Sequence, residues 1–297
     1  MEWAGVIPAI TTPFKPDLSV DHQFLARHSW WLFENGCTGI VALGSLGEGA
    51  TLRREEKPHV LRTCATALRG KVPLIAGISA LSTADAVQLA RDAAEAGSKG
   101  LMVLPPYLYS TDWREMKAHV AAILRATDLS CMLYNNPISY KTDFLPKQIR
   151  ELADEHPNLH AVKESSADVR RIAAIRALTG QRLAILVGVD DLIVEGIQAG
   201  ACGWIAGLAN AFPRESVALF DRAKDSGMGG AFGLYRWFLP LLRMDTVPKF
   251  VQLIKLAQQE IGMGSARVRP PRLELEGSEL EQAKATIRAA LADRPSP

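Results

Sequence analysis

The chain has 297 residues, enough for one large α/β barrel or for two ordinary domains. Hydrophobic residues make up 48% of it and charged residues 22%, both ordinary for a globular protein. The net charge is +2 and no basic block is present, so composition gives no indication of a nucleic-acid partner or an anionic membrane.

The cysteines and the N-terminal residues favour a cytoplasmic protein. Cys37, Cys64, Cys131 and Cys202 are scattered, without CxxC or metal-finger spacing, which points to a reducing compartment. The first residues show neither the charged nor the apolar segment of a signal peptide. No apolar run approaches the roughly 18 residues of a membrane-spanning helix.

Short apolar runs alternate with helix-length segments along most of the chain. Predicted strands cover residues 6–11, 39–43, 73–77, 100–104, 130–134, 159–163, 184–187 and 203–206. Most are continuously apolar, as expected for parallel strands covered on both faces. Apolar residues spaced three and four apart predict helices at 21–35, 53–68, 83–96, 112–126, 143–155 and 168–178. Asp112 and Asp143 are candidate N-caps of two of these helices.

Eight β-α units in this order predict a (β/α)8 TIM barrel. The alternative, an open doubly wound sheet, would place a glycine-rich phosphate loop after its first strand, and this chain has none there. From residue 229 onward the pattern is helical only, at 229–244, 248–261 and 277–291. We predict a barrel over residues 1–228 and a C-terminal helical extension over residues 229–297, packed on the side of the barrel.

The ends of the fifth and sixth strands carry the strongest chemical signal. Active sites of such barrels lie where the strands end. Lys163 ends an apolar strand, where a lysine must be paired or lose its proton, and a neutral amine attacks carbonyl and imine carbon. Tyr134 ends the preceding strand in the same way. Two neighbouring strands that finish on proton-handling side chains predict a Schiff-base enzyme, with a surface position as the alternative for Lys163.

Other strand ends have two readings each. Strand two ends in a loop with glycines at 44, 47 and 49, which is either a backbone cradle for a carboxylate or a flexible turn. Tyr107 and Tyr109 follow strand four, where packing is the alternative to chemistry. Asp190 follows strand seven as a helix cap or as a ligand of a substrate hydroxyl.

Two further features are assigned no chemistry. The sequence contains no HExxH motif, no paired-carboxylate spacing and no Cys-His cluster, so we expect no metal site. The pair Arg170 and Arg171 is predicted to lie on a solvated helix face.

Several motifs stand at the predicted strand ends, in order along the chain. They are Gly44-Ser45-Leu46-Gly47-Glu48, Tyr134-Asn135-Asn136-Pro137, Lys163-Glu164-Ser165 and Gly188-Val189-Asp190-Asp191. With these motifs the chain resembles the dihydrodipicolinate synthase and N-acetylneuraminate lyase superfamily of class I aldolase-like enzymes, from the first strand to the last helix. The resemblance implies a TIM barrel with added C-terminal helices.

The resemblance also implies a mechanism. Lys163 would form a Schiff base with a small keto or imino acid, Tyr134 would shuttle protons, and no other cofactor would be needed. Further catalytic residues would be Ser45 and Tyr107, in a dimer or tetramer where a neighbouring subunit's tyrosine can complete the proton relay. The implied substrate-binding residues are Ser45, Leu46, Gly47, Ser165, Gly188, Asp190 and Ile205.

Departures from the synthase pattern narrow the choice of substrate. Dihydrodipicolinate synthases usually carry two threonines where this chain has Ser45 and Leu46, and a tyrosine where Leu108 aligns. They also carry an arginine for the aldehyde substrate's carboxylate where Ser139 aligns. A serine cannot replace the bidentate clamp that arginine provides, so lysine biosynthesis is not favoured.

Additional stretches resemble the bacterial 1-pyrroline-4-hydroxy-2-carboxylate deaminases of hydroxyproline breakdown. They include Val169-Arg170-Arg171-Ile172, Gly203-Trp204-Ile205-Ala206-Gly207, Leu234-Tyr235-Arg236-Trp237-Phe238 and Lys249-Phe250-Val251-Gln252. The expected products are then 2,5-dioxopentanoate and ammonia. The alternatives are a pyruvate-dependent aldolase acting on a 2-keto-3-deoxy sugar acid, a dihydrodipicolinate synthase, and a non-catalytic barrel that binds keto acids.

Overall fold

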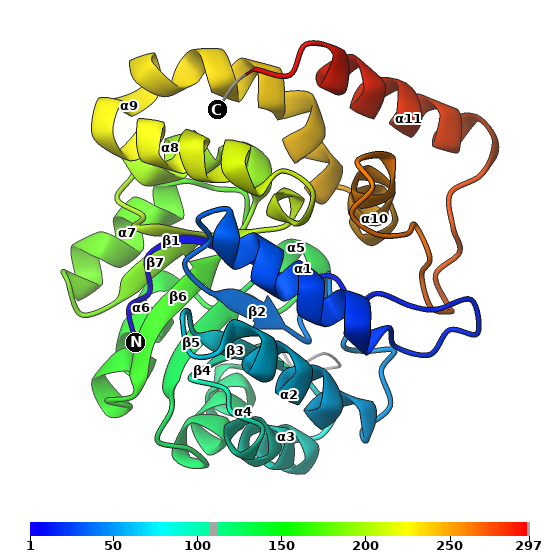
Figure 1. The fold of residues 1–297 in the computed structure, drawn as a ribbon. Helices are drawn as coiled ribbons and strands as arrows, with labels where there is room; N and C mark the ends of the chain where they lie inside the picture. Colours follow the sequence, from blue (N-terminus) through cyan, green and yellow to red (C-terminus); the bar gives the residue numbers. More distant parts are fainter. Residues whose placement is uncertain (107–111, 296–297) are drawn as a thin grey trace.

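The computed structural model describes residues 1–106 and 112–295. Its centre is an eight-stranded parallel sheet in the order β1-β8-β7-β6-β5-β4-β3-β2 (Figure 1). A parallel bridge between Ala9 and Val41 joins the two ends of this order, and the Ile10 amide donates to the Val41 carbonyl at 2.8 Å. The strands therefore form a nearly closed barrel, and the predicted (β/α)8 fold is confirmed.

The strands are β1 (Gly5–Pro8), β2 (Ile40–Ala42), β3 (Leu74–Ile78), β4 (Gly100–Val103), β5 (Ser130–Asn135), β6 (Leu159–Glu164), β7 (Ala184–Val187) and β8 (Gly203–Ala206). The helices of the barrel are α1 (His22–Glu34), α2 (Glu56–Leu68), α3 (Thr83–Glu95), α4 (Trp113–Arg125), α5 (Pro137–Tyr140), α6 (Pro146–Glu155), α7 (Arg170–Thr179) and α8 (Ile193–Gln198). Two short 3-10 helices, η1 (Asp190–Leu192) and η2 (Leu208–Asn210), follow β7 and β8.

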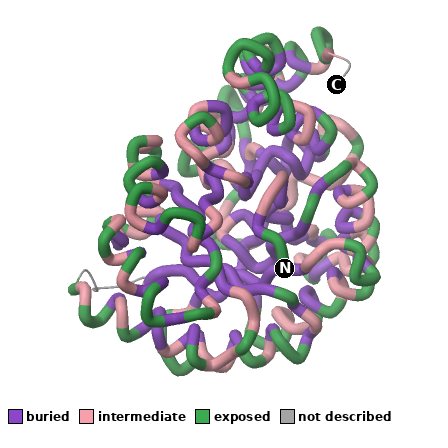
Figure 2. Tube along the Cα trace, turned by 90° about the vertical axis from the view of Figure 1, so that its left-hand side faces the viewer, coloured by how far each residue is buried: buried purple, intermediate pink, exposed green. Residues whose placement is uncertain are grey.

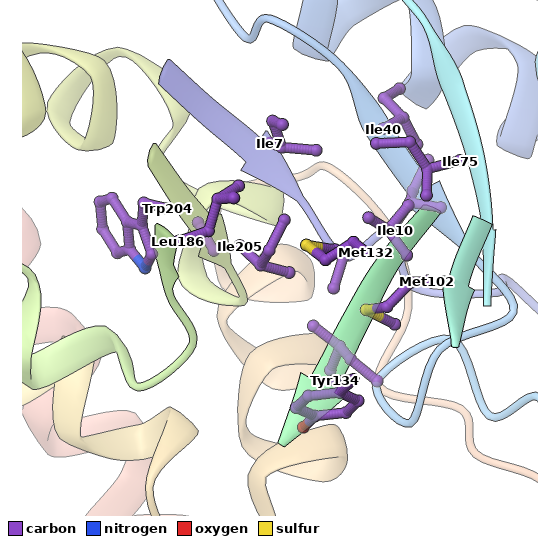
Figure 3. Close-up of a cluster of buried hydrophobic side chains, with 14 of the residues drawn as sticks. Ile7, Ile10, Ile40, Ile75, Met102, Met132, Tyr134, Leu186, Trp204 and Ile205 are labelled. Carbon is purple, nitrogen blue, oxygen red and sulfur yellow. The ribbon is translucent and has the colours of Figure 1, made fainter. Parts of the chain in front are cut away.

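Continuous apolar strands produce a barrel that is buried on both faces. The interior is filled by side chains from several strands, among them Met102, Met132 and Ile205, and Tyr134 lies at one end of this cluster (Figure 3). In Figure 2 the buried residues gather in the middle of the molecule, and the exposed residues lie mostly on its outer turns. This packing leaves the C-terminal ends of the strands as the place where polar side chains gather.

The two predicted helix caps had different outcomes. Asp112 caps α4 as predicted, because its carboxylate accepts the amides of Arg114 and Glu115. The prediction that a helix begins at Asp143 is wrong: α6 begins at Pro146, whose fixed φ suits the first helical turn. Asp143 instead pairs with the guanidinium of Arg171.

Three helical segments follow β8 and lie along one side of the strands (Figure 1). They are α9 (Pro213–Leu242), α10 (Phe250–Glu260) and α11 (Gly277–Ala292), with η3 (Arg243–Asp245) between α9 and α10. The helical path of α9 is broken at Gly227, where φ is 62° and ψ is −163°. This break lies beside the predicted boundary after residue 228, and the division into two units stays a prediction. Within the described residues, no helix has the length and apolar character needed to cross a membrane.

Candidate active site

Lys163 and Tyr134 face each other across two paired strands. The two residues are direct partners in the parallel ladder between β5 and β6, so their side chains leave the sheet on the same face. Lys163 is 7% exposed and Tyr134 is 4% exposed. The Lys163 Nζ lies 4.0 Å from the centroid of the Tyr134 ring, and no ion pair joins it to a carboxylate of the described residues. The buried amine thus contacts a phenol and not an acid, and the surface alternative for Lys163 is wrong.

Gly188 makes room for the Lys163 side chain. A Cβ at Gly188 would clash with Ser165 Oγ and with Lys163 Cε, and would lie 2.8 Å from Lys163 Cγ. The Ser165 hydroxyl donates to the Gly188 carbonyl at 3.0 Å, which holds the β6 and β7 ends together. Gly188 and Ser165, both predicted as substrate-binding residues, are therefore direct neighbours of the lysine.

A short helix after β5 adds a second tyrosine that sequence reasoning missed. The Asn136 side chain caps α5 by accepting the Ser139 amide, and its Nδ2 donates to the Tyr134 hydroxyl at 2.9 Å. This turn brings the Tyr140 hydroxyl into a hydrogen bond with Ser45 Oγ. The Tyr140 ring also packs edge-on against Tyr134, with centroids 5.7 Å apart. Tyr140 thus contacts both residues within a single chain, Ser45 by a hydrogen bond and Tyr134 by ring packing.

The loop after β2 is tightly packed and presents free backbone amides. Among the described residues, the amides of Ser45, Leu46 and Gly47 donate no hydrogen bond. The Gly47 carbonyl accepts the Thr12 hydroxyl at 2.6 Å, and a Cβ at Gly47 would lie 2.9 Å from the Ile10 carbonyl oxygen. Successive free amides in a constrained loop are suited to bind a carboxylate, as the cradle hypothesis requires.

A buried ion pair holds this loop against the C-terminal helices. Glu48 is 0% exposed and accepts a hydrogen bond from the Lys255 ammonium of α10, which is 1% exposed. The second Glu48 oxygen accepts the Arg269 amide at 3.0 Å. Burial is the largest influence on Lys255 and lowers its pKa to about 8, while the Glu48 carboxylate acts in the opposite direction. The loop conformation therefore depends on residues far away in the sequence.

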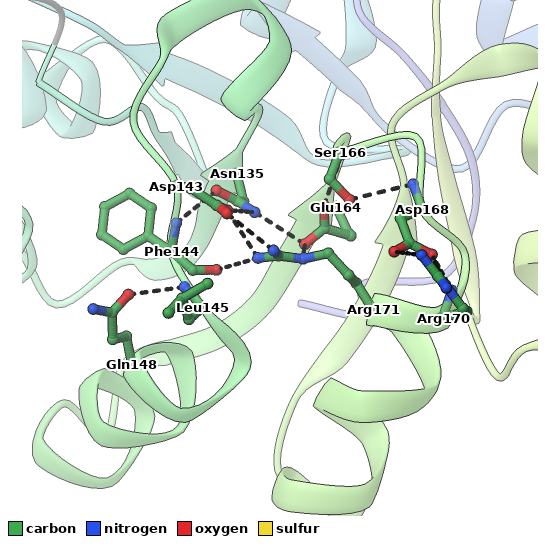
Figure 4. A network of polar contacts seen from close by, with 10 residues as sticks. All are labelled: Asn135, Asp143, Phe144, Leu145, Gln148, Glu164, Ser166, Asp168, Arg170 and Arg171. Carbon is green, nitrogen blue, oxygen red and sulfur yellow. Dashed lines mark hydrogen bonds and ion pairs between the residues drawn. The ribbon is translucent and has the colours of Figure 1, made fainter. Parts of the chain in front are cut away.

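A polar network lies on the outer face of the two strands that carry Lys163 and Tyr134 (Figure 4). The buried Glu164 accepts Asn135 Nδ2 at 3.1 Å and the Ser166 amide at 2.7 Å. The Arg171 guanidinium binds both oxygens of Asp143, at 2.8 and 3.0 Å, and lies 3.6 Å from Glu164. Burial is the main cause of a raised pKa at Glu164. These bonds hold the residues that directly follow Tyr134 and Lys163.

The network corrects one prediction. Arg170 lies on a solvated surface as expected, with 87% of its side chain exposed and an ion pair to Asp168. For Arg171 the prediction is wrong, because only 16% of its side chain is exposed and it links Asp143 to Glu164. Adjacent arginines on a helix point about 100° apart, so sequence adjacency does not give them the same environment.

Asp190 is buried at the end of β7 and is fully engaged by protein donors. Its carboxylate accepts the Trp204 indole N–H at 2.9 Å, the Gly207 amide at 3.1 Å and the Leu208 amide at 2.7 Å. Burial raises its pKa to about 6, and the donors and the charge of Lys163 oppose this rise. These contacts tie the ends of β7 and β8 together, which favours a positioning role over direct binding of a substrate hydroxyl.

The remaining predicted residues divide into two groups. Leu46 is buried within the β2 loop, and Ile205 lies inside the barrel (Figure 3). Tyr107 falls outside the described residues, so its role stays a prediction. The sequence signal for Tyr140 was a second tyrosine shortly after the Asn-Asn-Pro turn, but only the fold shows its contact with Ser45.

No cluster of three or more His, Cys, Asp or Glu side chains suited to a metal ion occurs in the described part of the chain.

The match to a family model settles the relationship that this geometry suggests. The model of the dihydrodipicolinate synthetase family matches residues 2–290. The chain belongs to this family. It is therefore a class I aldolase-like enzyme of the superfamily that the sequence motifs resemble.

Individual relatives agree over nearly the whole length. A 4-hydroxy-tetrahydrodipicolinate synthase of Methanothrix thermoacetophila is 32% identical, with 90% of each chain covered. A crystal structure described as a putative dihydrodipicolinate synthetase from Pseudomonas aeruginosa is 29% identical, with a TM-score of 0.92 over 97% of this chain and 100% of that one. A dihydrodipicolinic acid synthase family protein of E. coli K12, solved with pyruvate, is 26% identical, with a TM-score of 0.91 over 97% of this chain and 99% of that one.

Proposed function

We propose that this protein is a Schiff-base deaminase that converts 1-pyrroline-4-hydroxy-2-carboxylate to 2,5-dioxopentanoate and ammonia. The observation that supports it most is the buried Lys163 amine beside the Tyr134 phenol, whose ring packs against Tyr140, the hydrogen-bond partner of Ser45. The free amides of the β2 loop supply a site for the substrate carboxylate. A related structure was solved with pyruvate, which like the proposed substrate is a small acid with an electrophilic C2 next to its carboxylate.

The reaction follows from this arrangement in balanced steps. The Lys163 amine attacks C2 of the cyclic imine, and the ring opens to leave a Schiff base at C2 and a free amine on C5. The iminium acidifies C3, and Tyr134 accepts the C3 proton. Ser45 and Tyr107 complete the proton relay. The resulting enamine expels the C4 hydroxyl as water. Tautomerisation yields a C5 imine, and hydrolysis of both imines releases ammonia, the dioxo acid and free Lys163.

The absence of an arginine clamp favours this substrate over the aldehyde of lysine biosynthesis. Ser139, which aligns with the arginine of the synthases, is exposed on α5, and its amide binds Asn136. A cyclic imine carries a single carboxylate, which the β2 loop can hold without a second clamp. The relatives named as 4-hydroxy-tetrahydrodipicolinate synthases keep that reaction as an alternative to be assayed.

An aldolase is the second candidate function, because the same Schiff base at C2 drives carbon–carbon cleavage in a 2-keto-3-deoxy sugar acid. Incubation with the pyrroline and with 2-keto-3-deoxy-gluconate separates the two. Ammonia from the first substrate supports the deaminase. Pyruvate from the second, without ammonia from the first, supports the aldolase.

Borohydride trapping tests the covalent step itself and excludes a barrel that only binds keto acids. With pyruvate and borohydride, wild type should gain the mass of one reduced adduct, and Lys163→Ala should gain none. Lys147→Ala, which removes an exposed lysine on α6, is the matched control and should label like wild type. Equal labelling of Lys163→Ala and wild type would remove the proposed role of Lys163.

We also propose a homodimer or a dimer of dimers, in which Tyr107 of a neighbouring copy contributes to the proton relay. Light scattering measures the oligomeric state directly. Mixed oligomers of Lys163→Ala and Tyr107→Phe chains test the exchange: recovery of activity after mixing supports shared sites. Without recovery, each chain holds a complete site of its own.

A further inference from the structure

Two carboxylates of different character lie where β7 and β8 end. Asp190 has donors on both oxygens and is held in place by them. Asp245 comes from η3, outside the barrel, and reaches back to the first residue after β8. A Cβ at Gly207 would clash with Asp245 Oδ1 and lie 2.7 Å from its Cγ, so the absent side chain of Gly207 is what admits the carboxyl group.

Asp245 differs from Asp190 because none of the described residues donates a hydrogen bond to it. Across the two described stretches of the chain, the Asp245 carboxyl accepts no hydrogen bond and forms no ion pair, and residue 245 is only partly buried. The charged groups that influence it are Asp190, Lys163 and Asp191. Asp191 in turn is engaged by Arg243, 3.8 Å away. Because no described residue binds this carboxyl group, its oxygens are available to a substrate at the end of β8.

The surroundings of Asp245 favour its protonated form. Burial raises the pKa of this carboxyl well above its usual range, and the charge of Asp190 adds to the rise. The positive charge of Lys163 acts in the opposite direction, and Asp191 adds a smaller contribution that raises the pKa. A protonated carboxyl group donates a hydrogen bond, which an ionised one cannot do.

Tyr134 and Asp245 lie at strand ends on opposite sides of β6, the strand that carries Lys163. In the sheet order, β5 with Tyr134 is one neighbour of β6, while β8, against which Asp245 packs, lies two strands away in the other direction. An elimination at C3 and C4 of a Lys163-bound substrate needs two groups. One accepts the C3 proton, and the other donates a proton to the departing oxygen on C4.

We propose that Asp245 is the acid that protonates the C4 hydroxyl group as it leaves the Lys163-bound substrate. This inference rests on the deaminase function proposed above. The enamine electrons form the C3–C4 double bond, the C4–O bond breaks, and the oxygen departs as water with the proton of Asp245. The carboxylate regains a proton from solvent before the next turnover. The chemical class that the site accepts is therefore a keto or imino acid with a hydroxyl group at C4.

The test compares wild type with Asp245→Asn, a variant of nearly the same shape that has no acidic proton. Asp225→Asn, on the exposed face of α9, is the matched control. With the 4-hydroxy pyrroline, kcat of Asp245→Asn should fall by about 10²-fold or more. Pyruvate has no leaving group, and its Schiff base forms without Asp245. The yield of the borohydride-reduced pyruvate adduct in Asp245→Asn should therefore stay within about twofold of wild type.

A substrate analogue distinguishes an acid from a packing residue. The 4-fluoro pyrroline expels fluoride, which needs less protonation than hydroxide, so Asp245→Asn should process it at close to the wild-type rate. Three results for Asp245→Asn would each overturn the proposal. They are an equal fall in kcat with the hydroxy and fluoro substrates, loss of the pyruvate adduct, and an unchanged kcat with the hydroxy substrate. If wild type itself releases no ammonia, the deaminase function fails and the inference fails with it. If wild type and Asp245→Asn release ammonia equally fast, only the inference fails.

Discussion

Replacing Gly188 by alanine tests how the fold places the catalytic amine. The added methyl group would lie 2.8 Å from Lys163 Cγ, while ordinary contact begins at 3.4 Å, so the lysine stem must move by 3.4 − 2.8 = 0.6 Å to regain ordinary contact. The Ser165 hydroxyl and Lys163 Cε lie even closer to the new methyl group. No positive φ is involved at Gly188, so the effect is one of space.

The expected cost has a structural part and a catalytic part. Overpacking a buried site lowers the free energy of unfolding by about 1–3 kcal/mol, measured by urea denaturation. Displacement of a reacting atom by a fraction of an ångström to 1 Å slows the reaction by as much as about 10²-fold. The catalytic part is measured as the rate of adduct formation between pyruvate and Lys163, trapped with borohydride at successive times.

Two further variants sharpen the result. Gly233→Ala, on the exposed side of α9 with no atom within 4 Å of the added Cβ, should be neutral or stabilising by up to about 1 kcal/mol. Adding Ser165→Ala to Gly188→Ala removes the clash with the Ser165 hydroxyl but not the clash with Lys163. The double variant should recover part of the free energy of unfolding, while adduct formation stays slow. If Gly188→Ala matched wild type in both measurements, the close packing of Lys163 against the end of β7 would be refuted.

Three other changes have defined outcomes. Lys255→Met should lower the free energy of unfolding in urea by about 3 kcal/mol, because the buried Glu48 loses its close partner and keeps only the Arg272 guanidinium at 3.9 Å. The added change Glu48→Gln should recover most of this loss, and a loss below about 1 kcal/mol would contradict the pairing. Burial lowers the pKa of His28 from 6.5 to about 4, so the folded state binds fewer protons than the unfolded state in that range. The free energy of unfolding should therefore fall by ~3 kcal/mol as the pH decreases from 6.5 to 4, and His28→Gln should lose this part of the pH dependence. Tyr140→Phe removes the hydroxyl that hydrogen-bonds Ser45 and keeps the ring beside Tyr134, so it should lower kcat for the pyrroline by about 10²-fold at unchanged KM and retain the pyruvate adduct. A change in KM alone would indicate that Tyr140 binds substrate and does not take part in proton transfer.

The order of the strands and the identity of the central pair could be predicted without coordinates. Buried parallel strands are continuously apolar, so a lysine or a tyrosine at the end of such a run is conspicuous. Lys163 and Tyr134 were identified in this way, and the ladder between β5 and β6 places them side by side. The glycine-rich loop after β2 was also identified from local composition, because glycine has local conformational consequences.

Contacts between residues distant in the chain had no comparable signal. Glu48 contacts Lys255, which lies 207 positions further along the chain. Asp245 reaches the end of β8 from η3, in the extension that the sequence pattern places outside the barrel. Arg171 and Arg170 are identical in type and adjacent, yet one is buried in a network and the other is solvated. Periodicity reports the face on which a residue lies, because it reflects the geometry of its own helix or strand. The partner that meets that face depends on how all the elements close around one barrel, which no local pattern encodes.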